Sequence, residues 1–159
     1  MRVLFEAADQ FDWRVHAYVL MRNHFHLALE TAQPSLGEGM HWLQTTMSTR
    51  FNRLRKEHGH LFQGRYKSLV IEDAAALSRV VDYMHLNPVR AKVIVPEQVG
   101  AYRWSSLAAL RRTPRPQALV CQRWLQQRGR WQDDQNGLRR YAELLKCWRP
   151  MRSGGRARG

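Results

Sequence analysis

The chain has 159 residues, enough for one domain with a hydrophobic core, and no apolar run approaches the roughly 20 residues of a membrane-spanning helix. Lys and Arg number 26 against 13 Asp and Glu, and a formal net charge of +13 favours a polyanionic partner such as nucleic acid. Cys121 and Cys147 lie far apart in the sequence, which excludes a zinc ribbon. The chain begins with no signal-peptide pattern, so a reducing cytoplasm is the expected location.

The N-terminal part of the chain predicts a helix followed by two strands. Residues 2–10 have the apolar spacing of the end of a helix. Residues 15–21 and 24–30 are apolar and β-prone, and residues 22–23 between them predict a turn or bulge. This segment therefore predicts a pair of neighbouring strands.

A long amphipathic helix is predicted next. Ser35 and Glu38 have the spacing of a capping box, and Gly59 marks the expected end of the helix. Apolar residues recur at helical intervals on one face, and the other face is basic. The apolar face consists of Leu36, Met40, Leu43, Met47, Phe51 and Leu54, and the basic face of Arg50, Arg53, Arg55 and Lys56.

A third strand and a further helix are predicted in the middle of the chain. Residues 65–72 are β-prone, and Asp73 is a suitable N-cap for a helix over residues 74–86. Pro88 disfavours helical geometry at Asn87, so we expect this helix to end there. The predicted order of elements is helix, strand, strand, helix, strand and helix. This order predicts a small α+β sandwich.

The C-terminal third has weaker patterns. A basic linker that contains prolines is followed by two short candidate helices, at residues 118–128 and 137–148. Residues 149–159, with four arginines and three glycines, predict a disordered basic tail. The expected organisation is a main domain over residues 1–110, a basic helical extension over residues 111–148 that anchors nucleic acid by charge, and the tail.

Two histidines form a candidate metal site. His24 and His26 lie two residues apart in an apolar strand, so their side chains are expected on one face. Paired imidazoles supply two ligands of a divalent ion but too few for a closed structural zinc site, so positions remain for water or substrate. The alternative is a pair of strand histidines hydrogen-bonded to neighbours. For the pair we favour the metal hypothesis.

Tyr83 is a candidate nucleophile. It lies late in the predicted helix on a face offset from the apolar one, and Asn87 follows one turn later on the same face. A tyrosine can attack a phosphodiester when a metal or base assists it, and the Asn87 amide oxygen can add a third metal ligand. The alternative, favoured for either residue alone, is that Tyr83 packs at the helix edge and Asn87 ends the helix.

Arginines recur beside aromatic residues, as in Arg65-Tyr66 and Tyr102-Arg103-Trp104. Phosphate contact combined with base stacking is a pattern used to bind single-stranded nucleic acid. The predicted DNA-binding residues are Arg22, Arg50, Arg53, Arg65, Tyr66, Lys67, Arg90 and Arg103.

Four blocks in the same order resemble the HUH single-tyrosine transposases, in particular the REP-associated tyrosine transposases. The resemblance implies a ferredoxin-like antiparallel sheet with helices on one face, Mg or Mn bound by His24, His26 and Asn87, and Tyr83 as the nucleophile. It further implies a 5′-phosphotyrosine intermediate on single-stranded hairpin DNA such as REP elements, in a bacterial cytoplasm at the nucleoid. The blocks are residues 15–27, 59–68, 82–91 and 102–106.

Members of that family usually begin with a further strand, which this chain lacks before its first helix. We therefore expect an N-terminally truncated version, in which an unpaired sheet edge leaves the chain poorly soluble or a homodimer that cleaves weakly. One competing hypothesis is a hairpin-DNA-binding protein that has lost catalysis. Another is an RNA-binding protein on a ferredoxin-like sheet, ranked low because the strand carries histidines where RNA-recognition strands carry aromatic residues.

Overall fold

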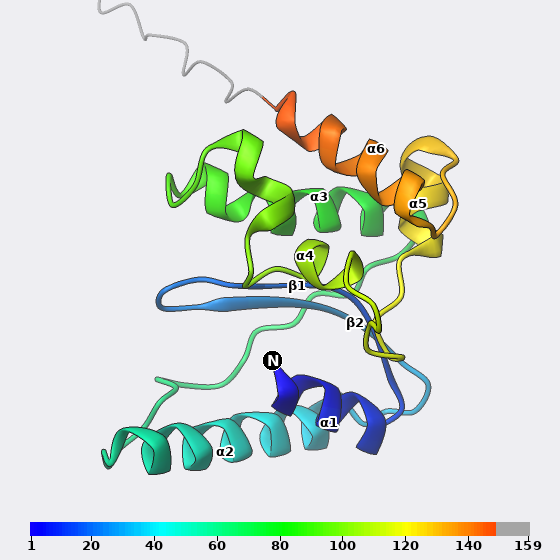
Figure 1. Ribbon diagram of the computed structural model, residues 1–159. Helices are drawn as coiled ribbons and strands as arrows, with labels where there is room; N and C mark the ends of the chain where they lie inside the picture. The colour runs from blue at the N-terminus through cyan, green and yellow to red at the C-terminus, as the bar shows by residue number, and fades with distance from the viewer. Residues whose placement is uncertain (149–159) are drawn as a thin grey trace, which may run out of the picture.

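The computed structural model describes residues 1–148, so the expected tail over residues 149–159 lies outside the described residues. A two-stranded sheet lies between two groups of helices (Figure 1). The elements are α1 Arg2–Gln10, β1 Trp13–Leu20, β2 Phe25–Thr31, α2 Leu36–Arg55, α3 Ala74–Arg90, the 3-10 helix η1 Pro96–Ala101, α4 Ser106–Leu110, α5 Gln122–Gly129 and α6 Gln135–Lys146.

The strands β1 and β2 form the predicted antiparallel hairpin. The register pairs Val19 with His26 and Leu20 with Phe25, and a bulge interrupts the pairing between Val15 and Ala17. The Met21 N–H donates to the His24 carbonyl over 2.8 Å and closes the turn. The predicted turn at residues 22–23 is therefore confirmed.

The two edges of the hairpin differ. The outer edge of β1 is covered, because Val15 exchanges backbone hydrogen bonds with Ala118 and Val120, and the Leu20 N–H donates to the Trp104 carbonyl over 2.9 Å. Within residues 1–148, the edge of β2 that faces away from β1 has no backbone partner. The sheet is therefore open on the side of β2.

The predicted third strand is wrong. Residues 65–72 form neither strand nor helix, and Leu69 and Val70 are 93% and 92% exposed. A β-prone segment becomes a strand only where its backbone pairs with a neighbour, and this segment pairs with neither edge of the hairpin, although the edge of β2 is open. The fold is α+β as expected, but the ferredoxin-like sheet is not confirmed.

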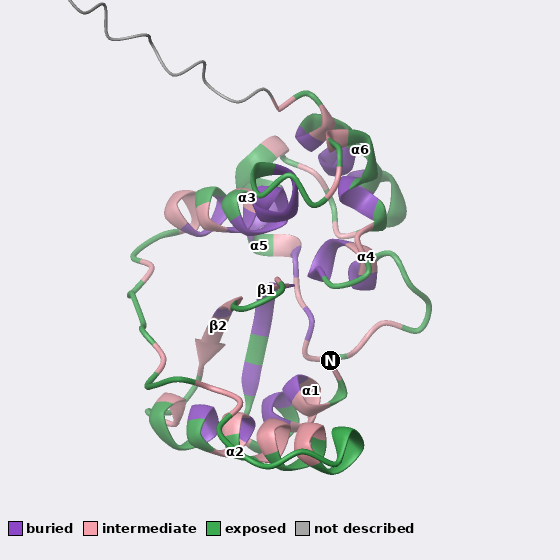
Figure 2. Ribbon diagram, turned by 90° about the vertical axis from the view of Figure 1, so that its left-hand side faces the viewer, coloured by how far each residue is buried: buried purple, intermediate pink, exposed green. Residues whose placement is uncertain are grey.

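Helices cover both faces of the hairpin, which corrects the expectation of helices on one face only. In Figures 1 and 2, α1 and α2 lie on one side of the sheet, and α3 to α6 lie on the other. Strand β1 is accordingly buried at Val15, Ala17 and Val19 and also at His16 and Tyr18, since both faces are in contact with helices. No helix within residues 1–148 has the length and apolar character to cross a membrane.

Helix α2 begins where predicted but without the predicted capping box. Ser35 precedes the helix, yet its side chain makes no cap hydrogen bond and instead accepts the Trp13 indole N–H over 3.2 Å. A Cβ on Gly39 would overlap the Trp13 ring, so this glycine allows the close approach. The apolar face of α2 extends beyond the residues that pack against it, and Leu54 near the end of the helix is 81% exposed.

Helix α3 begins as predicted but does not stop before Pro88. The Asp73 carboxylate caps it by accepting the Ala76 N–H over 2.6 Å. The helix continues to Arg90, with Pro88 and Val89 both buried. Burial of this last turn offsets the local cost of proline, since a buried valine contributes about 1.5–3 kcal/mol.

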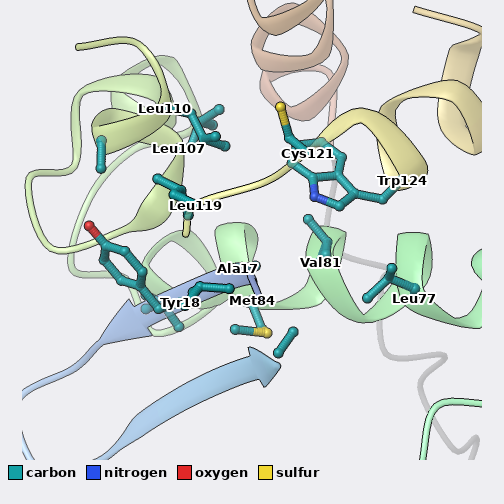
Figure 3. Close-up of a cluster of buried hydrophobic side chains, with 14 of the residues drawn as sticks. Ala17, Tyr18, Leu77, Val81, Met84, Leu107, Leu110, Leu119, Cys121 and Trp124 are labelled. Atoms are coloured by element: carbon teal, nitrogen blue, oxygen red, sulfur yellow. The ribbon is translucent and has the colours of Figure 1, made fainter. Parts of the chain in front are cut away.

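Helices α5 and α6, which lie in the expected basic helical extension, contribute side chains to the core. Trp124, Leu125 and Tyr141 are fully buried. Figure 3 shows Trp124 and Cys121 beside Val81 and Leu77 of α3. A single hydrophobic cluster joins these residues to β1 and α1, so the hairpin and α3 share their core with the C-terminal helices.

Candidate active site

The two histidines lie side by side at the turn end of the hairpin. His24 immediately precedes β2 and His26 is its second residue, and their ring centroids are 5.2 Å apart. The Asn23 amide oxygen lies 2.8 Å from Nδ1 of His24. Because this oxygen can only accept, Nδ1 carries the proton and Nε2 of His24 keeps a free lone pair.

The surroundings of His26 favour its neutral form. Burial, followed by the positive charge that His24 can carry, lowers the pKa of His26 below its usual value. Neutral imidazoles are the form that binds a divalent cation. Within residues 1–148, no group of three or more His, Cys, Asp and Glu side chains converges. A cation held by these two imidazoles would have to take its other ligands from an amide, water or DNA.

Tyr83 lies directly beside the histidine pair. Its ring centroid is 5.9 Å from that of His26, and the residue is 46% exposed, which leaves the phenol accessible from solvent. Asn87 lies one turn later in α3 and is buried. Helix α3 and strand β2 thus bring together two histidines and a tyrosine that are almost 60 positions apart in the sequence.

A positive charge lies against the tyrosine. The guanidinium carbon of Arg90 is 5.2 Å from the centroid of the Tyr83 ring. Arg90 is the last residue of α3, and it reaches this position because the helix continues past Pro88. The Arg90 guanidinium also lies 5.8 Å from the Trp148 ring, so two aromatic rings flank it.

The other predicted DNA-binding residues lie at several places on the surface. Arg22 is exposed in the hairpin turn, Arg50 pairs with Glu6 over 2.7 Å, and the Arg103 guanidinium stacks 4.5 Å from Trp104. Arg53 and Lys67 are exposed. A cavity of about 410 Å³ is lined by Gly37, His41, Gln44, Arg65, Tyr66 and Ser68.

A buried polar network next to the site was not predicted. His85 is 1% exposed and lies between the Ser106 hydroxyl, at 2.7 Å, and the Tyr141 hydroxyl, at 3.0 Å. The Tyr141 hydroxyl donates to Asp82 over 2.9 Å, and Arg128 pairs with Asp82 over 2.8 Å. The network joins four helices, and no local sequence pattern connects residues so far apart in the chain.

The comparison with known families matches residues 1–87 to the family described as "Transposase IS200 like". The matched range covers more than half of the chain and contains His24, His26 and Tyr83. The chain belongs to this family, and membership implies DNA binding and transposase-type DNA cleavage. Comparisons with curated proteins and with solved structures gave no match.

Proposed function

We propose that this protein cleaves single-stranded DNA with Tyr83 as the nucleophile, in the manner of REP-associated tyrosine transposases acting on DNA hairpins in a bacterial cytoplasm at the nucleoid. The observation that carries the proposal is the contact of His26 with both His24 and Tyr83, at ring separations of 5.2 and 5.9 Å. A half-exposed tyrosine beside two imidazoles combines an accessible nucleophile with candidate ligands for a cation.

The covalent step follows from the chemistry of a phenol and a phosphodiester. The Tyr83 hydroxyl oxygen bonds to the phosphorus while its proton passes to water. The bond from phosphorus to the 3′ oxygen breaks, and that oxygen takes up a proton to become a free hydroxyl. The product is a 5′-phosphotyrosine, which keeps the energy of the broken bond and allows a second 3′ hydroxyl to rejoin the strand.

His24 and His26 would hold Mg²⁺ or Mn²⁺, with Asn87 as the proposed third ligand. When bound, such an ion polarises the scissile phosphate and stabilises charge on its oxygens. The hydrogen bond from His24 Nδ1 to Asn23 orients the ring and leaves Nε2 available. The basic residues of the surface, including Arg22 and Arg103, would bind the phosphates that flank the cleaved bond.

The proposal is tested with a 3′-labelled hairpin oligonucleotide in Mg²⁺ or Mn²⁺, with the covalent adduct read on a denaturing gel, because the 3′ part of the strand is the part that stays on the tyrosine. Tyr83→Phe removes only the hydroxyl and should abolish the adduct while hairpin affinity is kept. Tyr102→Phe is the matched control, because the Tyr102 hydroxyl only donates to the Leu20 carbonyl. A full-strength adduct in the Tyr83→Phe protein would contradict the assignment of the nucleophile.

The metal ligands are tested in the same assay. His24→Gln and His26→Gln should each lose the adduct in both cations, and His58→Gln, an exposed histidine just beyond α2, should keep it. Retention of adduct in both ligand variants would contradict the metal assignment.

A second candidate function is hairpin binding without cleavage. The observation that favours it is the open edge of β2, since the strand that carries His26 is paired on one side only. A protein that binds hairpin DNA tightly but gives no adduct in either cation would have this second function.

A further inference from the structure

The last turn of α3 places a cation beside the proposed nucleophile. Tyr83 and Arg90 are seven residues apart, two helical turns, so they share one face of the helix. Helical side chains tilt toward the N-terminus, which directs the Arg90 guanidinium back to the Tyr83 ring. Arg90 lies outside residues 1–87, the range that matches the family.

Trp148 lies against the same guanidinium, at 5.8 Å from its ring centroid, while Tyr83 lies at 5.2 Å. Trp148 follows α6, and its N–H donates to the Leu145 carbonyl over 3.1 Å. Arginine carries four rotatable side-chain bonds and loses much rotamer entropy when it is ordered. Aromatic contacts restrict it to few conformations before any phosphate binds.

The buried network fixes α6 against the helix that carries Tyr83. The Tyr141 hydroxyl donates to Asp82 and therefore accepts the Nδ1 proton of His85, whose Nε2 in turn accepts from the Ser106 hydroxyl. Asp82 and His85 lie one residue before and two residues after Tyr83. Because Tyr141 belongs to α6, these bonds fix the position of α6 along α3 and thereby that of Trp148.

We propose that the C-terminal helices complete the active site, and that Trp148 is a positioning residue that holds Arg90 over Tyr83, where Arg90 contacts the scissile phosphate. A guanidinium binds phosphate oxygens in a bidentate manner, and the transition state of the attack carries more negative charge on those oxygens than the substrate does. An arginine ordered in advance acts without reorganisation cost. The inference rests on the proposed role of Tyr83.

The test compares rates of adduct formation in a single turnover at saturating hairpin DNA, in the full-length protein. Trp148→Leu should slow the step roughly 5- to 20-fold with the Kd for the hairpin changed less than about twofold, since it alters positioning and not binding. Trp148→Phe, which keeps a ring, should restore most of the rate. Leu144→Ala, a surface change on α6, is the matched control and should react like the unmodified protein.

A double-mutant cycle isolates the route through Arg90. Arg90→Ala should slow the step by roughly 100-fold, the order of loss for a charge-stabilising donor, and Trp148→Leu should then add no further loss. An equal loss from Trp148→Leu with and without Arg90, or an unchanged rate, would overturn the proposal.

A second measurement separates this inference from the proposed function. Two flanking rings shift the NMR signals of the Arg90 side chain, and that shift should shrink in Trp148→Leu and persist in Trp148→Phe. If the unmodified protein forms no adduct, the proposed cleavage fails, and the NMR shift alone decides whether Trp148 orders Arg90. An Arg90 signal that Trp148→Leu leaves unchanged would overturn the positioning role.

Discussion

Removal of the Tyr141 hydroxyl is a sharp test of the network that joins α6 to α3. Tyr141 is fully buried, and burial raises the pKa of its phenol well above 10, so the hydroxyl remains protonated and donates to Asp82. Tyr141→Phe keeps the ring and its packing against Trp124, at 4.8 Å between centroids. The substitution therefore affects two hydrogen bonds and little else.

The expected cost follows from the groups left behind. The Nδ1–H of His85 loses its acceptor inside the core, and an unsatisfied buried donor costs about 1–3 kcal/mol. Asp82 loses one donor but keeps the ion pair with Arg128, which limits its share to about 1 kcal/mol. The free energy of unfolding should fall by about 2–4 kcal/mol.

Urea denaturation followed by circular dichroism measures this change, with an unchanged m value as the check that unfolding remains two-state. Tyr102→Phe is the control: its hydroxyl makes one part-buried hydrogen bond, so the cost should stay near 1 kcal/mol. A loss in Tyr141→Phe no larger than in Tyr102→Phe would refute the argument that the network fixes α6.

Four further predictions concern the whole molecule. Burial lowers the pKa of His85 from 6.5 to about 3, so between these pH values the unfolded chain binds this proton and the folded chain does not. The free energy of unfolding should fall by up to about 1.4 kcal/mol for each pH unit below 6.5 in this range, and urea titrations that give a flat profile there would contradict this. Hairpin affinity should fall with salt by a slope of about −0.7 per phosphate contact, checked by fluorescence anisotropy. Truncation after Leu110 removes Trp124 from the core and should unfold the protein, as seen by loss of its cooperative thermal transition. The open edge of β2 predicts homodimers in light scattering, and a clean monomer would count against pairing through that edge.

Local patterns in the sequence were sufficient for the hairpin, the start of α3 and the pairing of the two histidines. The spacing of two positions placed His24 and His26 together in the prediction, and their rings do lie side by side, although His24 falls just before β2 and only His26 belongs to the strand. Asp73 caps α3 through a hydrogen bond that spans three residues. These features depend on groups close together in the chain, so their spacing alone predicts them.

Tertiary contacts decided the features that local patterns predicted wrongly. Residues 65–72 have strand propensity, but they pair with no strand although the edge of β2 is open, so they stay irregular. Ser35 is a residue type that often caps helices, yet here its hydroxyl accepts a hydrogen bond from the Trp13 indole N–H and caps nothing. Pro88 should end a helix, but packing of the last turn of α3 outweighs its local cost.

The surroundings of Tyr83 were likewise beyond local patterns. Arg90 lies against the tyrosine because α3 continues past Pro88, and Trp148 lies against Arg90 just after α6, a helix that a buried hydrogen bond from Tyr141 to Asp82 joins to α3. Spacing along the sequence therefore predicted that His24 and His26 lie together, while their role in catalysis and that of Tyr83 remain proposals. The support of these side chains comes from residues some 60 positions away, because burial and hydrogen bonding act between neighbours in space.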